Sequence, residues 1–189
     1  MAIETPASQA TAEDLLRLSS QSDHRLELVN GEIVEMSPTG GRHGKIAFQI
    51  GVVIDAFTRP RNLGTIFAAE TGFMLHRSPD LVRAPDIAFV TGNRLPVEDV
   101  PDGFIELAPD FVVEVVSPSD TANAVQTRID DWLRAGTAIV WTVYPASQTV
   151  FIHRGLDHIE RRSVDDELDA EPVLPGFRVR VNEIFQPVG

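Results

Sequence analysis

The sequence predicts an α+β domain, similar to α/β proteins, in which helices flank a mixed β-sheet. Three observations predict this fold class. Two alternating runs on either side of Asn30-Gly31 indicate a β-hairpin. Two later segments carry apolar residues at helical spacing. Short runs of β-branched and aromatic residues indicate strands between and after these helices. Helices and strands that interleave in this way are typical of a sheet covered by helices.

The amino-terminal part predicts a short helix followed by the hairpin. Thr11 is suited to cap the helix, and Asp14 stands at the capping-box position. The hairpin joins residues 24–29 to residues 32–36. Glu27 belongs to the solvent-facing set of this alternation, and it can still point towards a cleft. The residues expected to face inward are Leu26, Leu28, Ile33 and Met36.

The rest of the chain predicts two long helices and a series of strands. Apolar residues at helical spacing cover residues 42–58, and Pro60 closes this segment. A second helix is expected over residues 120–135, with Gly136 as its carboxy-terminal stop. Residues 92–109 form a polar loop. The expected strands cover residues 64–69, 72–76, 86–91, 111–116, 138–144, 148–153, 158–163 and 177–181.

Length and composition predict one domain. A chain of 189 residues is long enough for a substantial core, and we expect a single domain over residues 11–189 after a flexible segment, residues 1–10. The chain has no cysteine, which excludes disulfides and thiolate zinc sites. No apolar run reaches the roughly 18 residues of a membrane span, and the amino terminus lacks signal-peptide features. A cytoplasmic protein without a membrane partner is expected.

The net charge of −12 argues against a general nucleic-acid coat protein, because such binding requires many cations that neutralise phosphates. This charge is still compatible with a nuclease that has a local basic groove, since a cluster of metal-binding carboxylates is itself acidic. Lys45 is the only lysine among 16 basic residues.

Two carboxylates lie at or within strands that the sequence predicts to be buried. Asp86 stands at the entrance of one strand, and Glu114 interrupts the apolar run Phe111-Val112-Val113-Glu114-Val115-Val116. A carboxylate inside such a strand is costly unless it is paired or holds a cation. Asp86 can also be interpreted as a turn residue after Pro85. Glu114 can also be interpreted as the partner of a buried arginine. If the two strands are neighbours, the carboxylates can share one Mg²⁺ or Mn²⁺ ion.

An ordered set of segments resembles a known family. These segments are, in chain order, residues 26–38, His43-Gly44, Arg83-Ala84-Pro85-Asp86, residues 109–119, Trp132-Leu133-Arg134-Ala135-Gly136, residues 140–145 and Leu174-Pro175-Gly176-Phe177. With these segments in this order, the chain resembles the putative restriction endonuclease family, a branch of the PD-(D/E)XK nuclease superfamily, over roughly residues 11–186.

The resemblance implies a restriction-endonuclease-like sheet and a divalent-metal-dependent endonuclease that hydrolyses DNA phosphodiester bonds. By position, Asp86 and Glu114 would be the ligands of Mg²⁺ or Mn²⁺, and Glu27 would be an accessory carboxylate from the hairpin. His43 matches a histidine near the cleft of the family, although a histidine at a helix start is also commonly structural. Relatives of this kind often pair to cut two strands, which makes a homodimer plausible.

One position departs from the superfamily pattern. Val116 stands where the superfamily usually has a lysine, and Arg128 stands where related families carry it, four residues before Trp132. Arginine can contact a phosphate but does not release its proton, so it cannot act as a base. Lys45 lies on another expected helix, where a solvated position is the simpler interpretation. The alternative function is therefore a catalytically degenerate nuclease fold that acts as a binding or assembly module.

Overall fold

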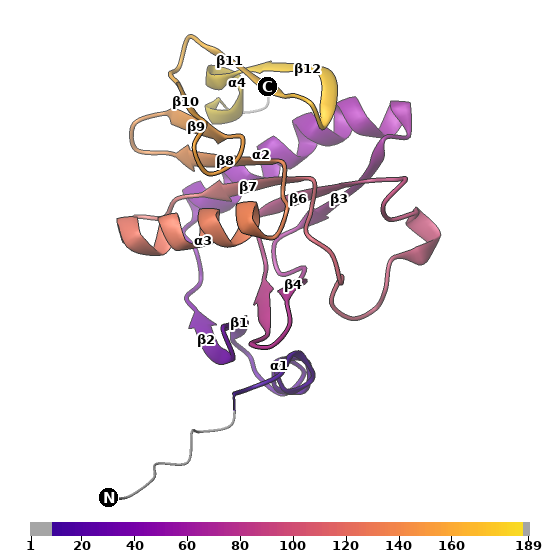
Figure 1. Ribbon diagram of the computed structural model, residues 1–189. Helices are drawn as coiled ribbons and strands as arrows, with labels where there is room; N and C mark the ends of the chain where they lie inside the picture. The colour runs from indigo at the N-terminus through magenta and orange to yellow at the C-terminus, as the bar shows by residue number, and fades with distance from the viewer. Residues whose placement is uncertain (1–8, 187–189) are drawn as a thin grey trace, which may run out of the picture.

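The computed structural model describes residues 9–186 and is built around a six-stranded mixed sheet (Figure 1). The strand order of this sheet is β10-β9-β8-β7-β6-β3, in which β7 and β8 are parallel and the other neighbours are antiparallel. Its strands are β3 (Gly64–Ala68), β6 (Ile87–Thr91), β7 (Phe111–Val115), β8 (Ile139–Tyr144), β9 (Thr149–His153) and β10 (Ile159–Arg162).

Two helices cover the opposite faces of this sheet. Helix α2 (Gly41–Thr58) packs on one face with the odd-numbered side chains of β7, such as Val113, whereas α3 (Ala122–Arg134) packs on the other with even-numbered ones, such as Val112. The alternation follows from the two-residue period of a strand. Because both faces are covered, β7 is buried along its whole length, and Glu114 is buried with it.

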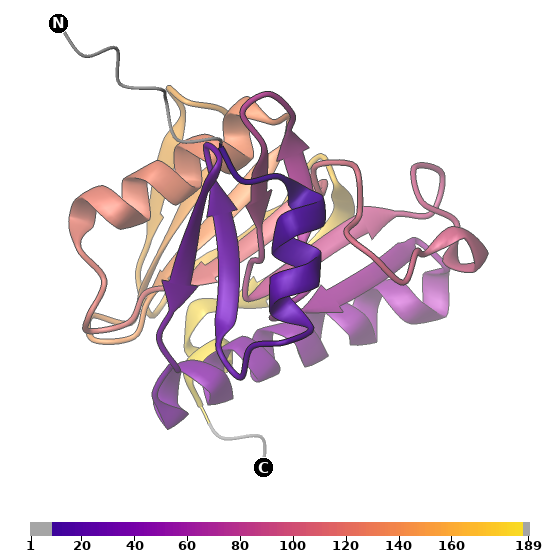
Figure 2. The same cartoon turned by 90° about the horizontal axis from the view of Figure 1, so that it is seen from below.

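The amino-terminal elements form a smaller unit beside the central sheet. Helix α1 (Ala12–Ser19) packs on a four-stranded sheet of order β2-β1-β5-β4, as Figure 2 shows from below. The capping box of Thr11 and Asp14 is present. Asn30 and Gly31 both have positive φ, of 53° and 80°, as a type I′ hairpin turn requires. The strands are β1 (Arg25–Val29), β2 (Glu32–Met36), β4 (Phe73–His76) and β5 (Leu81–Arg83).

The carboxy-terminal elements complete the core on the α2 side. A two-stranded sheet of β11 (Glu167–Ala170) and β12 (Leu174–Arg180) leads into the short helix α4 (Val181–Phe185), which contacts α2. Gln49 of α2 is buried and donates a hydrogen bond to the Glu183 carbonyl. These elements therefore fix the position of α2 over the sheet.

The predicted fold class and the order of its main elements are confirmed. Strands 86–91 and 111–116 are neighbours, as the shared-cation interpretation requires. Three short elements were not expected from the sequence: β5, β11 and α4. Most of the predicted flexible segment, residues 1–10, lies outside the described residues. Between residues 9 and 186, no helix combines the length and the apolar character that a membrane crossing demands.

Candidate active site

Asp86 and Glu114 are brought side by side by the register of two strands. Ile87, the first residue of β6, pairs with Val113 of β7, so Asp86 and Glu114 each stand one residue beyond this pair in the antiparallel register. Side chains that are directly opposite have Cβ atoms about 5 Å apart. β6 begins only at Ile87, so the backbone ladder between the two strands stops there. The Asp86 side chain replaces the next backbone acceptor: its Oδ2 accepts a 2.8 Å hydrogen bond from the Val115 N–H.

Glu114 is a buried carboxyl group with an unusual protonation equilibrium. Burial and the nearby charge of Asp86 raise its pKa to about 7, although Arg128 and the Trp132 hydrogen bond act in the opposite direction. Its Oε1 accepts a 2.7 Å hydrogen bond from Trp132 Nε1. Its other oxygen, Oε2, lies 3.9 Å from Arg128 Nε, beyond hydrogen-bond distance. A buried pair of like charges is a common sign of a functional site.

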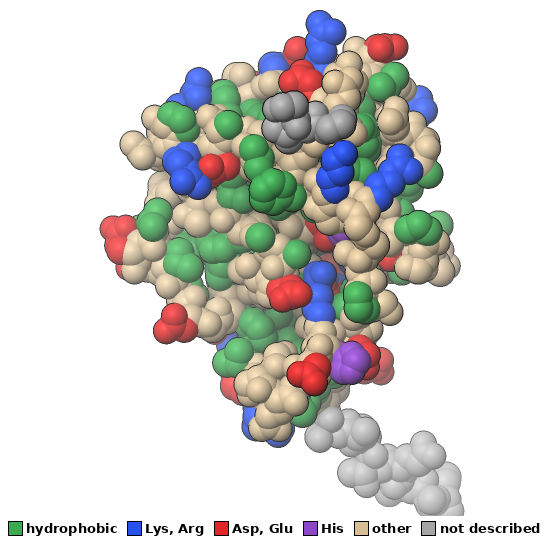
Figure 3. All heavy atoms as spheres, turned by 180° about the vertical axis from the view of Figure 1, so that it is seen from behind, with side chains coloured by type: hydrophobic (Ala, Val, Ile, Leu, Met, Phe, Trp, Pro, Cys, Tyr) green, Lys and Arg blue, Asp and Glu red, His purple; other side chains and the backbone are tan. Residues whose placement is uncertain are grey.

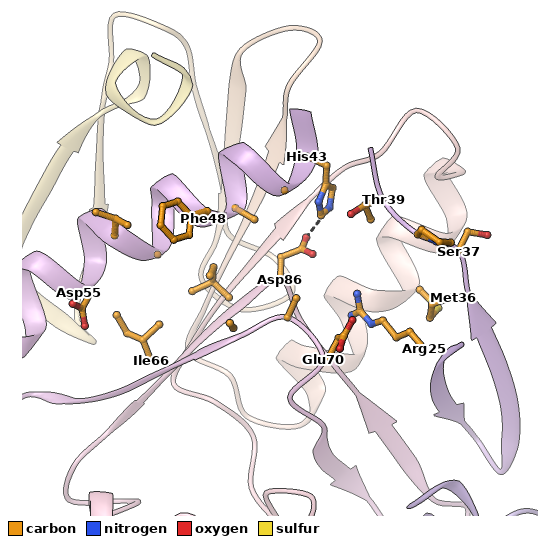
Figure 4. A pocket seen from close by; sticks show the side chains of 18 of the residues that line it. Arg25, Met36, Ser37, Thr39, His43, Phe48, Asp55, Ile66, Glu70 and Asp86 are labelled. Carbon is orange, nitrogen blue, oxygen red and sulfur yellow. Dashed lines mark ion pairs between the residues drawn. The ribbon is translucent and has the colours of Figure 1, made fainter. Parts of the chain in front are cut away.

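His43 contacts Asp86 from the start of α2. Its Nε2 lies 3.1 Å from Asp86 Oδ2, the same oxygen that accepts the Val115 N–H (Figure 4). Burial lowers the pKa of His43, but the hydrogen bond to Asp86 and the charge of Asp86 outweigh it, and the net pKa is raised. The other ring nitrogen, Nδ1, is buried and has no hydrogen-bond partner among residues 9–186. His43 therefore holds one oxygen of Asp86 in a fixed orientation.

Arg128 is the arginine that lies next to Glu114. It projects from α3, with Nη2 3.3 Å from Asp120 Oδ2 and Nε 3.9 Å from Glu114 Oε2. Burial lowers its pKa, but the charges of Glu114 and Asp120 raise it more strongly, so the guanidinium stays charged. Arg128 Nε is buried and makes no hydrogen bond within the described residues. This N–H is therefore left without an acceptor, with Glu114 Oε2 just beyond hydrogen-bond distance.

Glu27 is buried in an ion network that links the hairpin to α3. Its Oε2 accepts a 2.8 Å hydrogen bond from Arg83 Nη1, and its Oε1 accepts a 3.2 Å bond from the Ala84 N–H. Arg83 also donates from Nε and Nη2 to Asp131 Oδ2, at 3.0 and 2.6 Å. Glu27 is therefore buried rather than solvent-facing, because Arg83 and the Ala84 N–H hold its carboxylate, and its charge acts on both Glu114 and Arg128.

Asp86, Glu114, His43 and Arg128 line a pocket of about 230 Å³ at the end of the central sheet. Asp86 and Glu114 form its acidic wall, and Arg25 and Arg128 supply positive charge. The loop after β7 contributes Ser117, whose hydroxyl is buried without a hydrogen-bond partner in the described region. Figure 4 shows the adjoining hollow, in which His43 points towards Asp86 and Arg25 approaches from the hairpin side.

The donor set of this pocket fits a hard divalent cation. Within the part of the chain that is described, no three His, Asp or Glu side chains converge closely enough to hold a metal ion between them. Two adjacent carboxylates are nevertheless sufficient for Mg²⁺, which commonly keeps several water ligands and completes its shell with substrate phosphate oxygens. Burial and the charge of Asp86 raise the pKa of Glu114, and a cation bound between the two carboxylates would act in the opposite direction.

The sequence interpretation named five site residues, and the structure groups four of them around one pocket: Asp86, Glu114, Arg128 and His43. Glu27 lies behind them in the network with Arg83. Lys45 is exposed on α2 and does not line the pocket.

Sequence reasoning missed the roles of Arg83, Asp131 and Ser117. It also treated Trp132 only as a core residue, although this buried indole orients Glu114. An arginine inside a three-residue apolar strand was the one available signal for Arg83.

Comparison with known proteins places this arrangement in a family. The sequence profile of the Uma2 family, described as "Putative restriction endonuclease", matches residues 12–182. The chain belongs to the Uma2 family. The predicted resemblance is therefore confirmed over almost the whole chain. No curated protein matches this Uma2 chain.

A solved structure shares the fold of this Uma2 protein. It is the crystal structure of a putative nuclease belonging to DUF820 from Anabaena variabilis, at 22% sequence identity and a TM-score of 0.81. The similarity covers 93% of the Uma2 chain and 97% of the Anabaena chain. The predicted nuclease-like fold, with its amino-terminal helix and hairpin, is thereby supported along the full length.

Proposed function

We propose that this protein is an endonuclease that hydrolyses DNA phosphodiester bonds with Mg²⁺ or Mn²⁺. The observation that carries the proposal is the buried pair of Asp86 and Glu114, on neighbouring strands and in one pocket with Arg128. Membership of a family described as putative restriction endonucleases supports the same reaction class. A cytoplasmic location, expected from the amino-terminal sequence, remains a prediction.

In this proposal the carboxylates bind the cation, and Arg128 contacts the phosphate. Asp86 and Glu114 would bind the ion, with Glu27 as an accessory carboxylate whose present partner is Arg83. A bound divalent ion polarises the phosphate and lowers the pKa of a bound water. His43 fixes Asp86, and Trp132 fixes Glu114, so both carboxylates are oriented before substrate arrives. The charged guanidinium of Arg128, which lines the pocket, would stabilise the negative charge that develops on a phosphate oxygen.

Cleavage of supercoiled plasmid tests the proposal. The wild-type protein is expected to nick the plasmid with Mn²⁺ or Mg²⁺ and not with EDTA. Asp86→Asn keeps the size of the side chain and an oxygen for the Val115 N–H but removes the charge, so we expect a loss of at least about 100-fold in rate. Glu106→Gln is the matched control, because Glu106 is an exposed carboxylate outside the pocket. Nicking that is equally fast in Asp86→Asn would contradict the proposal.

Arg128 supports a second candidate, a nuclease fold without catalysis that binds or assembles with other molecules. The guanidinium stands in the pocket beside Glu114 and cannot accept a proton from water. Arg128→Lys discriminates the two candidates in the same assay. If Arg128 acts only through its charge, the variant keeps activity to within about tenfold of wild type. A variant that cleaves when the wild type does not would show that the natural chain lacks a base, and would favour the second candidate.

A further inference from the structure

The outer face of α2 has an apolar centre that the described protein leaves uncovered. Phe48 is 70% exposed and Val52 41%, although both lie in the middle of an 18-residue helix. Figure 3 views the molecule from this side, where hydrophobic side chains gather over the middle of the face and charged ones surround them. Large exposed aromatic side chains of this kind commonly mark interaction surfaces.

One line of residues along α2 forms a seam. Its members are Gly41, Lys45, Phe48, Val52 and Asp55 of α2 and Arg59 directly after it, which recur at alternating intervals of four and three residues; all are exposed except Asp55, which is half-buried. This spacing is the one by which a helix packs lengthwise against another helix. The helix is about 27 Å long, so the seam offers an extended line of contact.

Two copies of the seam that run in opposite directions are complementary to each other. Residues 45 and 55, 48 and 52, and 44 and 56 are each equidistant from residue 50. In an antiparallel pair of α2 helices related by a two-fold axis, Lys45 of one copy lies level with Asp55 of the other, and Phe48 with Val52. Such a self-complementary patch is what a two-fold dimer interface requires.

The charges and small residues agree with this reversed pairing. Lys45 forms no ion pair within residues 9–186, and Asp55 pairs only with Arg59 on its own helix, in an exposed contact of little energy. Gly44 and Ala56 are both exposed and small, so two helix backbones can approach closely at these levels. A Cβ atom placed on Gly44 would meet nothing within 4 Å.

A hollow beside the seam can accept the protruding aromatic ring. This hollow has a volume of about 670 Å³ and lies between α2, β3 and the hairpin, with Val52 and Ile66 among its apolar lining (Figure 4). We propose that α2 packs antiparallel against α2 of a second copy of this chain, with Phe48 of each copy seated beside Val52 and Ile66 of the other. The same hollow contains His43 and Asp86, so the interface adjoins both active sites.

Sedimentation equilibrium of the full chain tests the pairing. The wild type is expected at twice its chain mass of 20.8 kDa, and Phe48→Glu is expected to raise the dimer dissociation constant by roughly 30-fold or more, as for a central aromatic contact. Val97→Glu is the matched control, because Val97 is 69% exposed and lies on a different element; it should leave the dimer intact. A wild-type monomer at high micromolar concentration overturns the proposal, as does a dimer that Phe48→Glu does not weaken.

Charge reversal and cross-linking test the direction of the helices. Lys45→Asp and Asp55→Lys should each weaken the dimer by about 3- to 10-fold, and the double variant should recover most of that loss. A chain that carries both Gly44→Cys and Ala56→Cys should form a disulfide-linked dimer, because the natural chain has no cysteine and these positions lie too far apart on one helix to join. If the wild type is monomeric and Phe48→Glu instead weakens plasmid binding, the face binds DNA and the dimer proposal is wrong.

Discussion

Replacing Arg83 with methionine is expected to lower the free energy of unfolding by about 3–5 kcal/mol, because the buried Glu27 and the half-buried Asp131 both lose a hydrogen-bonded guanidinium, and only the more distant Arg25 stays near Glu27. The Arg83 side chain is 8% exposed and contacts Glu27 at 2.8 Å and Asp131 at 2.6 Å. Burial lowers the pKa of Arg83, but the charge and hydrogen bond of Glu27 raise it by more, so the net pKa is raised. The guanidinium is therefore charged in the folded protein. Urea unfolding monitored by tryptophan fluorescence gives the measurement.

Arg77→Met is the matched control for this substitution. Arg77 also contacts carboxylates, namely Glu13, Asp80 and Glu106, but its side chain is 47% exposed. Surface pairs of this kind contribute at most about 1 kcal/mol. Adding Glu27→Gln and Asp131→Asn to Arg83→Met should recover part of the lost stability, because the uncompensated charges are removed. An equal cost for Arg83→Met and Arg77→Met would show that the buried network contributes no more than a surface pair.

Replacing Glu114 with glutamine is expected to abolish plasmid nicking and yet stabilise the metal-free protein at pH 8. The pKa of Glu114 is about 7 in the folded protein, compared with 4.5 for an unperturbed glutamate. Between these values the folded chain holds a proton that the unfolded chain has released. The free energy of unfolding therefore falls as the pH rises from 4.5 to 7, by an amount on the order of 3 kcal/mol. Glutamine stays neutral and avoids this loss.

Urea unfolding with EDTA at pH 5 and pH 8 separates this effect from ordinary damage. At pH 8 the Glu114→Gln variant should be more stable than wild type by roughly 2–3 kcal/mol, and at pH 5 the difference should shrink to well under 1 kcal/mol. Glu106→Gln, on the exposed surface, should behave as wild type at both pH values. A Glu114→Gln variant that is less stable than wild type at pH 8 would mean that the carboxylate is already well compensated without a metal ion.

The parts of the fold that local chemistry determines could be predicted from the sequence. The hairpin depends on Asn30 and Gly31, which tolerate the positive φ of its turn, and α3 ends at Arg134, two residues before Gly136, whose φ is 103°. The short elements could not be predicted, because they depend on contacts made elsewhere in the fold. Strand β5 has three residues and pairs with both β1 and β4, and α4 has five residues held against α2.

In the candidate site, too, some features follow from the local sequence and others depend on contacts between distant residues. Asp86 and Glu114 were recognisable because a carboxylate beside or inside an apolar strand needs a partner. Which partner each one has is a matter of tertiary structure: Trp132 reaches Glu114 across 18 positions of the chain, and Arg83 joins Glu27 across 56. No spacing rule predicts pairs at such separations.

The small amino-terminal core has a consequence for how the pocket fluctuates. Among residues 9–186, the cluster under α1 contains five buried apolar residues, whereas α2 and the central sheet share a far larger one. Transient local unfolding begins where the fewest apolar contacts must be broken, so we expect α1 and the hairpin to detach before the central sheet does. Each such excursion would carry away Arg25 and Glu27, while Asp86 and Glu114 stay beside the paired strands β6 and β7.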